Sequence, residues 1–227
     1  MKREIEPIAY IHTDFTEKFG IPRQSGRVKE LTGEIVFEPK FRHPDALREI
    51  EGFSHLWLIF DFSLAHKSEF SPTVRPPRLG GNKRVGVFAS RSPFRPNSMG
   101  LSCVELVEIK HTENQGDVLV VAGADLLDGT PIYDIKPYLP FTDAKPDAKA
   151  GYTLFTNEHR LNVEFKAELL EILPEDKRAG ATACLAEDPR PAYQEDSERI
   201  YSMAFAGYDI HFKVMGDTLT VTGIDKK

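Results

Sequence analysis

The sequence of 227 residues is poor in features that mark several common classes of protein. It has two cysteines, Cys103 and Cys184, which lie far apart and lack metal-ligand spacing, so we predict reduced thiols and no disulfide. No apolar run approaches the roughly 20 residues of a membrane span. The N-terminal stretch lacks the apolar segment of a secretory signal. These absences argue against a membrane protein and indicate the cytoplasm.

Motifs that bind nucleotides or metals are absent as well. No GxGxxG follows a predicted strand, and the sequence has no GxxxxGK[ST], no HExxH, no paired CxxC and no EF-hand spacing. The seven histidines are too widely spaced for a local metal signature, so no metal site is predicted. A doubly wound dinucleotide-binding fold is therefore not expected.

Acidic residues are missing from one long segment, residues 70–104. It carries six cations, while the whole chain has a net charge of -6. Its prolines and glycines predict shaped loops on both sides of VGVF (85–88), which reads as a short strand. Charge alone is equally typical of a solvated basic surface, whereas charge together with fixed loops favours an anion-binding site.

The remaining patterns predict a mainly β protein. Residues 54–62 (SHLWLIFDF) are nearly continuously apolar, which is typical of a strand buried on both faces. Further strands are predicted at 34–37, 102–110 and 118–121, with turn residues between them and little helix. This spacing favours an antiparallel barrel or sandwich.

The composition changes at Thr142, where TDAKPDAKAGY reads as a linker or surface crossing. We therefore predict a first domain over residues 1–145 and a second over 146–227. The second contains a predicted helix at 175–186 and ends in a hairpin that turns at Gly216 and Asp217.

Five stretches taken together resemble the TsaA-like family of tRNA methyltransferases, TrmO type. They are PRQSG (22–26), EGFSHLWLIFDF (51–62), RPPRLGGNKRVGVFASRSPFRPNSMGLS (75–102), LLDGTPIYDIKPYLPF (126–141) and DPRPAY (188–193). The resemblance implies a single-sheet antiparallel β-barrel N-terminal domain with a smaller α/β C-terminal domain, working as a homodimer. It also implies methyl transfer from S-adenosyl-L-methionine to N6 of N6-threonylcarbamoyladenosine at tRNA position 37.

The resemblance further implies which residues hold the methyl donor. The expected set is Gln24, Ser25, Gly26, Ser63, Leu64, His66, Lys67, Arg91, Leu101, Leu126, Leu127, Asp128, Gly129 and Thr130. Two departures from the family pattern stand out: SLAHK (63–67) lacks the histidine–glutamine expected near its start, and RPNSMG (95–100) replaces the commoner RPNPIG. The first of these makes the 63–67 wall the least secure part of the expected pocket.

Charge and chemistry assign the remaining roles. Arg91 suits the donor carboxylate, and Asp128 is a candidate base for the proton of the substrate nitrogen. Asp125, Asp128 and Asp134 also have a simpler interpretation, as turn residues that bond their own backbone. The residues expected to bind tRNA are Arg75, Arg78, Lys83, Arg84, Arg95, Arg190 and Tyr193.

Two other functions are compatible with the sequence. A nucleic-acid-binding module without catalysis would use the basic segment, with Phe88 and Phe94 stacking on bases. A methyltransferase acting on a small molecule or a protein would leave that segment as ordinary surface. Binding of S-adenosylmethionine separates the first alternative from the enzyme, and a steep salt dependence of substrate binding separates the second.

Overall fold

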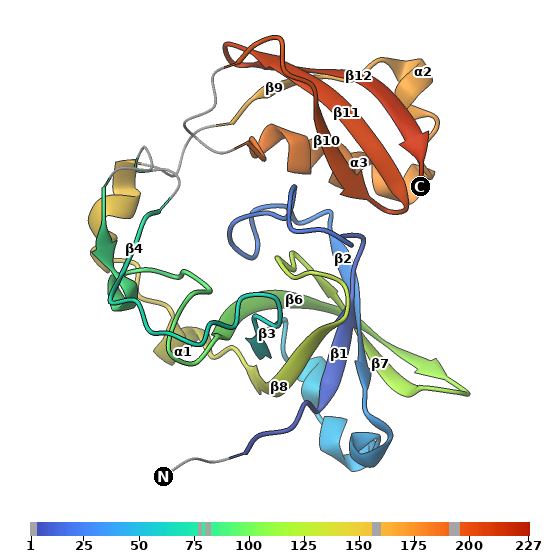
Figure 1. The fold of residues 1–227 in the computed structure, drawn as a ribbon. Coiled ribbons are helices and arrows are strands. Elements are labelled where there is room, and N and C mark those ends of the chain that lie inside the picture. The colour runs from blue at the N-terminus through green and yellow to red at the C-terminus, as the bar shows by residue number, and fades with distance from the viewer. Residues whose placement is uncertain (1–3, 77–78, 80–82, 156–159, 191–195) are drawn as a thin grey trace.

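The computed structural model describes residues 4–76, 79, 83–155, 160–190 and 196–227. Strands dominate it, which confirms the prediction of a mainly β protein, and within these residues they form three separate sheets (Figure 1). Short 3-10 helices connect several of the strands: Pro39–Phe41, Pro44–Leu47, Ile50–Gly52, Val87–Ala89 and Gly151–Phe155.

The first sheet has six strands in the order β1-β2-β7-β6-β3-β8 and closes into a barrel. Closure follows from β1, which pairs antiparallel with β2 on one side and with β8 on the other: Ile11 lies opposite Ile35 and opposite Thr130. The strands are β1 (Ala9–His12), β2 (Thr32–Phe37), β3 (His55–Asp61), β6 (Met99–Thr112), β7 (Gly116–Ala122) and β8 (Thr130–Pro137).

The central strand β3 corrects one prediction. Its burial alternates residue by residue, with Leu56, Leu58 and Phe60 inside, so it is buried on one face and not on both. The outward Trp57 is nevertheless partly covered, because its indole packs against Tyr138 at 5.7 Å and its Nε1 donates to Asp143 Oδ2 at 3.0 Å. A partly covered outer face explains why the whole run is apolar.

The basic segment forms a small ribbon of its own. In it β4 (Thr73–Val74) pairs antiparallel with β5 (Val85–Gly86), and the chain then turns through the 3-10 helix Val87–Ala89. The predicted strand at 85–88 is therefore half strand and half turn. The turn is anchored by Val87, which is buried, while Phe88 beside it is 75% exposed.

The C-terminal unit is a four-stranded sheet in the order β10-β11-β12-β9 with two helices, and β9 runs parallel to β12. The predicted helix at 175–186 and the hairpin turning at residues 216 and 217 are both confirmed. The elements are α1 (Pro140–Asp143), which precedes the unit, then β9 (Asn162–Glu164), α2 (Ala167–Leu170), α3 (Glu175–Ala186), β10 (Tyr201–Phe205), β11 (Tyr208–Met215) and β12 (Thr218–Lys226).

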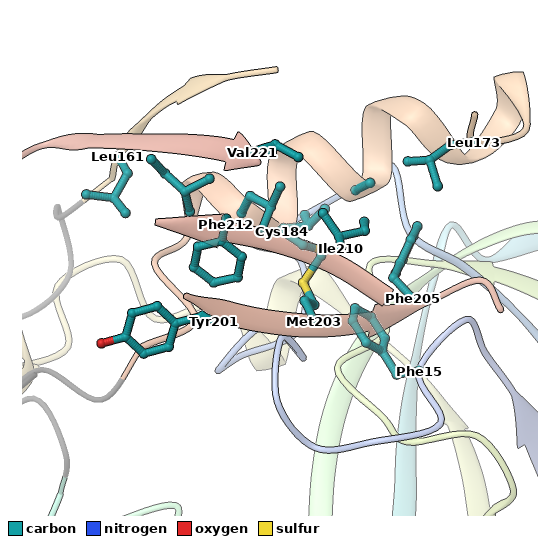
Figure 2. Packing of buried hydrophobic residues seen from close by; sticks show 14 of the residues in the cluster. Phe15, Leu161, Leu173, Cys184, Tyr201, Met203, Phe205, Ile210, Phe212 and Val221 are labelled. Carbon is teal, nitrogen blue, oxygen red and sulfur yellow. The ribbon is translucent and has the colours of Figure 1, made fainter. Parts of the chain in front are cut away.

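The protein has two hydrophobic cores, and one of them combines residues from both ends of the chain. One fills the barrel. The other lies between α3 and the C-terminal sheet, yet it includes Phe15, Val28 and Leu31 from the loop after β1. Figure 2 shows Phe15 beside Met203 and Phe205, and its ring meets that of Phe205 edge-on at 5.3 Å. The loop over residues 13–31 is therefore shared by both units.

Within the part of the chain that the structure describes, no helix has the length and apolar character needed to cross a membrane.

Candidate functional site

The candidate site lies at an edge of β6 that no neighbouring strand occupies over its first residues. Residues 99–105 of β6 pair with β3 on one side, but pairing with β7 on the other side begins only at Glu105. Below that point the Cys103 N–H donates instead to Ser25 Oγ, at 3.2 Å. The PRQSG loop thus satisfies a backbone group that a strand would otherwise bind.

A second loop, residues 123–129, meets the first at the same edge. The Gly26 N–H donates to the Gly123 carbonyl at 2.8 Å, and the Gly123 N–H donates to the Leu31 carbonyl at 2.8 Å. The Ser102 hydroxyl donates to Asp125 Oδ1 at 2.5 Å. Two loops that are a hundred residues apart in sequence are therefore joined through backbone and side-chain hydrogen bonds.

Arg91 completes this cluster from the basic segment. Its Nη1 donates to Gln24 Oε1, while Gln24 Nε2 donates to the Arg23 carbonyl at 2.5 Å. Burial raises the pKa of the Asp125 carboxyl, and the Ser102 hydrogen bond and the charge of Arg91 oppose that rise. The cluster offers a guanidinium for a carboxylate, a carboxylate for hydroxyl or ammonium groups, and the apolar Leu101, which is 56% exposed.

The predicted wall of the site, residues 63–67, contacts the loop after β1 and the basic segment. The Leu64 carbonyl accepts from Lys18 Nζ at 3.0 Å, and its side chain is 64% exposed. His66 Nε2 lies 2.8 Å from Asp61 Oδ1. Lys67 Nζ lies 4.2 Å from the centre of the Phe94 ring, and Ser63 is exposed. These contacts tie the wall to the basic segment and to the loop after β1.

The 126–130 stretch divides between core and surface. Leu126 and Thr130 are buried, and Leu126 belongs to the barrel core. The Thr130 hydroxyl donates to the carbonyl of the half-buried Leu127, at 2.7 Å. Asp128 is exposed: its Oδ1 accepts from the Thr13 N–H at 3.1 Å and lies 3.2 Å from His12 Nδ1. The three aspartates considered together from the sequence, Asp125, Asp128 and Asp134, have different partners in the structure. Asp125 accepts from Ser102, whereas Asp134 pairs with Lys136.

Two cavities occur elsewhere among the described residues. One of about 220 Å³ borders Gly129 on the outer face of β1 and β2; it is lined by Tyr10, His12, Val36, Phe37, Glu38 and Arg42 as well. The other, of about 530 Å³, lies between α3 and β9 of the C-terminal unit. Neither lining includes Gln24, Arg91 or Leu101; these residues belong to the cluster in which the loops converge at the edge of β6.

The predicted tRNA-binding cations separate into two groups. Arg75 and Lys83 are exposed, as is Arg84, whose Nη1 donates to Thr73 Oγ1 at 2.9 Å across the β4–β5 ribbon. Arg95 is half-buried and fixes its own loop, since its Nη1 donates to the Ser90 and Ser92 carbonyls at 2.9 and 3.3 Å. The predictions for Arg78 and Tyr193 fall outside the described residues.

Arg190 lies on the C-terminal side of the same site. Its Nε and Nη2 donate to Asp188 Oδ1 and Oδ2 at 2.8 and 3.0 Å, with both side chains about nine-tenths covered. The Arg190 carbonyl accepts from Arg23 Nη2 at 2.9 Å. Residues 188–190 of the DPRPAY motif therefore contact the PRQSG loop through backbone carbonyls that accept from Arg23.

Sequence reasoning missed three residues of the cluster: Ser102, Cys103 and, as a member of the donor site, Asp125. Asp125 immediately precedes the motif that the resemblance began at Leu126, in the loop that follows the strand Gly116–Ala122. A carboxylate in the loop that leaves a buried strand is a usable local signal. The contacts of Ser102 and Cys103 span 23 and 78 residues, and nothing local in the sequence announces them.

Among the described residues, no group of three or more His, Cys, Asp or Glu side chains is arranged to hold a metal ion.

Fold and site together define a mainly β protein whose candidate ligand site is built from loops at a strand edge, beside a basic segment. Comparison with protein families places it further. The model of the tRNA-methyltransferase O N-terminal domain matches residues 10–144, and that of the TrmO C-terminal domain matches residues 158–227. The chain belongs to the TrmO family.

Individual relatives agree with this assignment. The chain is 42% identical over 219 residues to the tRNA (adenine(37)-N6)-methyltransferase of Escherichia coli, covering 93% of each chain. It is 46% identical over 164 residues to the enzyme of that name from Eikenella corrodens, covering 71% of this chain and 91% of the relative. A crystal structure of TrmO from P. aeruginosa superimposes with a TM-score of 0.81 at 33% identity, over 100% of this chain and 98% of the other.

Proposed function

We propose that the chain is an S-adenosylmethionine-dependent tRNA methyltransferase that methylates N6 of adenine 37. The observation that carries this function is the 42% identity, over nearly the whole length of both chains, to an enzyme named for that reaction. The site supports it independently, because three segments implied in donor binding meet through the Ser25–Cys103, Gly26–Gly123 and Gln24–Arg91 hydrogen bonds.

The residues present fit the methyl donor. Arg91 is an exposed cation that suits a carboxylate, Asp125 is an acceptor for hydroxyl or ammonium groups, and Leu101 is an exposed apolar wall on β6. The donor would supply an electrophilic methyl group, which passes to the substrate nitrogen in one step as its bond to the sulfonium sulfur breaks and the thioether leaves. The contribution of the protein is then chiefly to align the substrate nitrogen with that methyl group. The two joined loops provide a rigid base for such alignment.

We assign removal of the nitrogen proton to Asp128. Its carboxylate is exposed, and the contacts to Thr13 N and His12 Nδ1 fix its direction. A carboxylate held in this way suits a general base. Asp128→Asn preserves the shape and the hydrogen bond from Thr13, so it should lower kcat, measured at saturating donor because Asp128 also belongs to the expected donor-binding set. Wild-type turnover in this variant would remove Asp128 from the chemistry.

The finer substrate proposal is that adenine 37 must first carry the threonylcarbamoyl group. The N6 of this substrate belongs to a urea, whose lone pair is delocalised, so reactivity alone gives no reason to prefer it. Recognition gives a reason to prefer the modified substrate, because its threonyl carboxylate adds an anion. Three cations of the acid-free segment, Arg75, Lys83 and Arg84, are exposed and available to it. When the bound tRNA covers these cations, a substrate without that anion leaves them unpaired, a discrimination of about 10³ or more.

One tRNA prepared in two forms tests this proposal under single-turnover conditions. The unmodified transcript should be methylated about 10³ times more slowly than the same sequence carrying the modification. Equal rates would show that the site reads bare adenosine, and the substrate proposal would fall while the methyltransferase assignment stands. Detection of the product by mass spectrometry of position-37 nucleosides excludes methylation elsewhere in the tRNA.

We also propose the expected organisation of the molecule: a donor-binding domain over residues 1–145, a second domain over 146–227, and a cytoplasmic homodimer. The family matches at 10–144 and 158–227 support the division. The dimer is supported by six large apolar side chains that are exposed in one stretch of a single protomer: Leu64, Phe70, Phe88, Phe94, Met99 and Leu101. Light scattering at micromolar concentration should give twice the mass of one chain.

The alternative of a nucleic-acid-binding module without catalysis keeps one supporting observation, the exposure of Phe88 and Phe94 at 75% and 43% within the basic segment. Calorimetry with S-adenosylmethionine decides between the two, because a module that only binds nucleic acid has no use for the donor.

A further inference from the structure

Two neighbouring acids at the end of α3 are buried, although acids rarely are. Glu187 and Asp188 are 6% and 7% exposed. Removing a carboxylate from water is costly unless cations or hydrogen-bond donors compensate it. Glu187 is compensated by Arg160 and by Arg27, the residue that follows the PRQSG loop, whereas Asp188 is compensated by Arg190.

Residues 24–26 are called the donor loop below, and Glu187 binds Arg27, the residue directly after it. Its Oε2 accepts from Arg27 Nε at 2.5 Å and its Oε1 from Arg27 Nη2 at 3.2 Å, which is the bidentate geometry of a strong charge-assisted pair. Arg160 adds a second cation, with Nη2 2.9 Å from Glu187 Oε1 and 3.2 Å from the Arg27 carbonyl. The side chain and the backbone of Arg27 are both held.

Asp188 shapes a corner that contacts Arg23, the residue before the donor loop. It adopts a left-handed conformation, with φ of 50°, and its carboxylate pairs with Arg190. This corner turns two carbonyls toward Arg23, whose Nη2 donates to the Asp188 and Arg190 carbonyls at 3.4 and 2.9 Å. A left-handed non-glycine residue costs energy that the surrounding contacts must offset, so the corner is specified by its ion pairs.

Gln24, Ser25 and Gly26 are therefore gripped from two directions. Cys103 of the barrel, Gly123 after β7 and Arg91 of the basic segment bind them on one side, and the C-terminal corner binds their flanking residues on the other. We propose that the acidic corner Glu187–Asp188 is a positioning element for the methyl-donor site, through which the C-terminal unit sets donor affinity. This inference rests on the proposed donor site, and neither acid touches the donor itself.

Loss of the corner should act on binding more than on chemistry. With the corner intact, the loop is held in one arrangement; without it, part of the protein carries a loop that does not bind. Coupling between linked sites typically changes affinity 5- to 150-fold, so we expect the donor Kd of Glu187→Gln to rise about tenfold. The kcat at saturating donor should stay near that of the wild type, because the change removes uniform binding alone.

The experiment measures the donor Kd by calorimetry, kcat and KM with tRNA, and the melting temperature for the full-length chain. The variants are Glu187→Gln and Arg27→Lys; the second keeps the charge, loses the bidentate geometry and should fold, with a Kd several-fold above wild type. The control is Val214→Ala, which shortens a buried side chain of β11 and leaves every ion pair of the corner in place. It should lower the melting temperature with an unchanged donor Kd.

The outcomes separate this inference from the function on which it rests. A raised donor Kd with near-normal kcat in Glu187→Gln and Arg27→Lys, absent in Val214→Ala, supports it. Wild-type donor affinity in Arg27→Lys and Glu187→Gln overturns it while the donor site stands. Equal losses of affinity in the corner variants and in Val214→Ala also overturn it, since general destabilisation then explains them. If the wild type itself fails to bind the donor, both proposals fall.

Discussion

Replacing Gly123 with alanine tests whether the two loops of the donor site depend on each other. Gly123 follows β7 with φ of +74°, a conformation that side chains rarely adopt. A Cβ placed there would lie 3.1 Å from Gly26 Cα and 3.2 Å from Gly26 N. Both are backbone atoms, which yield less easily than the end of a flexible side chain. The substitution therefore presses on the donor loop itself.

The expected cost has two parts. A left-handed conformation with a Cβ costs about 1–2 kcal/mol, and crowding in a packed site typically costs about 1–3 kcal/mol. We expect the free energy of unfolding to fall by about 2–5 kcal/mol in all. The contact also pushes Gly26 away from Gly123, whose carbonyl accepts its N–H at 2.8 Å. Misplacement of a binding group by about 1 Å can cost on the order of 10²-fold in rate.

Gly207→Ala is the matched control. Gly207 has φ of +79°, and a Cβ there would meet no described heavy atom within 4 Å. The free energy of unfolding of Gly207→Ala should fall only by the conformational cost, about 1–2 kcal/mol, and its donor affinity should be unchanged. Urea unfolding gives the first quantity and calorimetry with S-adenosylmethionine the second. Equal stability losses in the two variants, together with wild-type donor affinity in Gly123→Ala, would refute the reasoning.

Three further predictions follow from the site. Arg91→Ala should weaken donor binding by about 1.5–3 kcal/mol, as for a charged hydrogen-bond partner; an unchanged Kd would remove Arg91 from the site. Charge reversal at Arg75, Lys83 or Arg84 should flatten the salt slope of tRNA binding by roughly 0.7–0.9 for each phosphate that the protein no longer neutralises and spare donor binding; tRNA affinity unchanged in all three would make the ribbon an ordinary solvated surface. Burial raises the pKa of Asp125 in the folded protein. The protonated carboxyl therefore contributes to the stability of the fold below about pH 4, and this contribution is lost as the pH rises through the folded pKa. The unfolding free energy of wild type minus that of Asp125→Asn should therefore fall between pH 4 and 7, and a rise would contradict the burial argument.

Local sequence signals predicted the fold where neighbouring residues decide the outcome. The helix at 175–186 begins with two acids and ends as its pattern indicates, and Gly216 provides the left-handed turn of the last hairpin, with φ of 58°. The prediction failed where distant residues cover a surface. The outer face of β3 is apolar because Tyr138 and Asp143 lie over Trp57, and an uncovered strand with the same fold would alternate visibly.

The candidate site divides in the same way. The motifs indicated which loops take part, and Gln24, Ser25 and Arg91 do meet. The buried acid Glu187 carries no local signal, because its partners Arg27 and Arg160 are 160 and 27 residues away in sequence and a charged residue at a helix end usually faces solvent. Hydrophobic periodicity does not reveal ion pairs between residues that are far apart in sequence. Residues that position a site are therefore harder to predict than those that form it.

The sharing of one loop between two cores has a consequence for how the units can be separated. Phe15, Val28 and Leu31 are at most 4% exposed, and they are covered by the C-terminal sheet and α3. Burial of such a side chain is worth about 1.5–3 kcal/mol. A chain cut near residue 145 would keep every strand of the barrel, yet it would expose the flanks of Gln24–Gly26. The proposed boundary along the chain lies near residue 145, whereas the core of the C-terminal unit extends into the loop over residues 13–31. We therefore expect such a cut to destabilise that loop, even though it leaves every strand of the barrel in place.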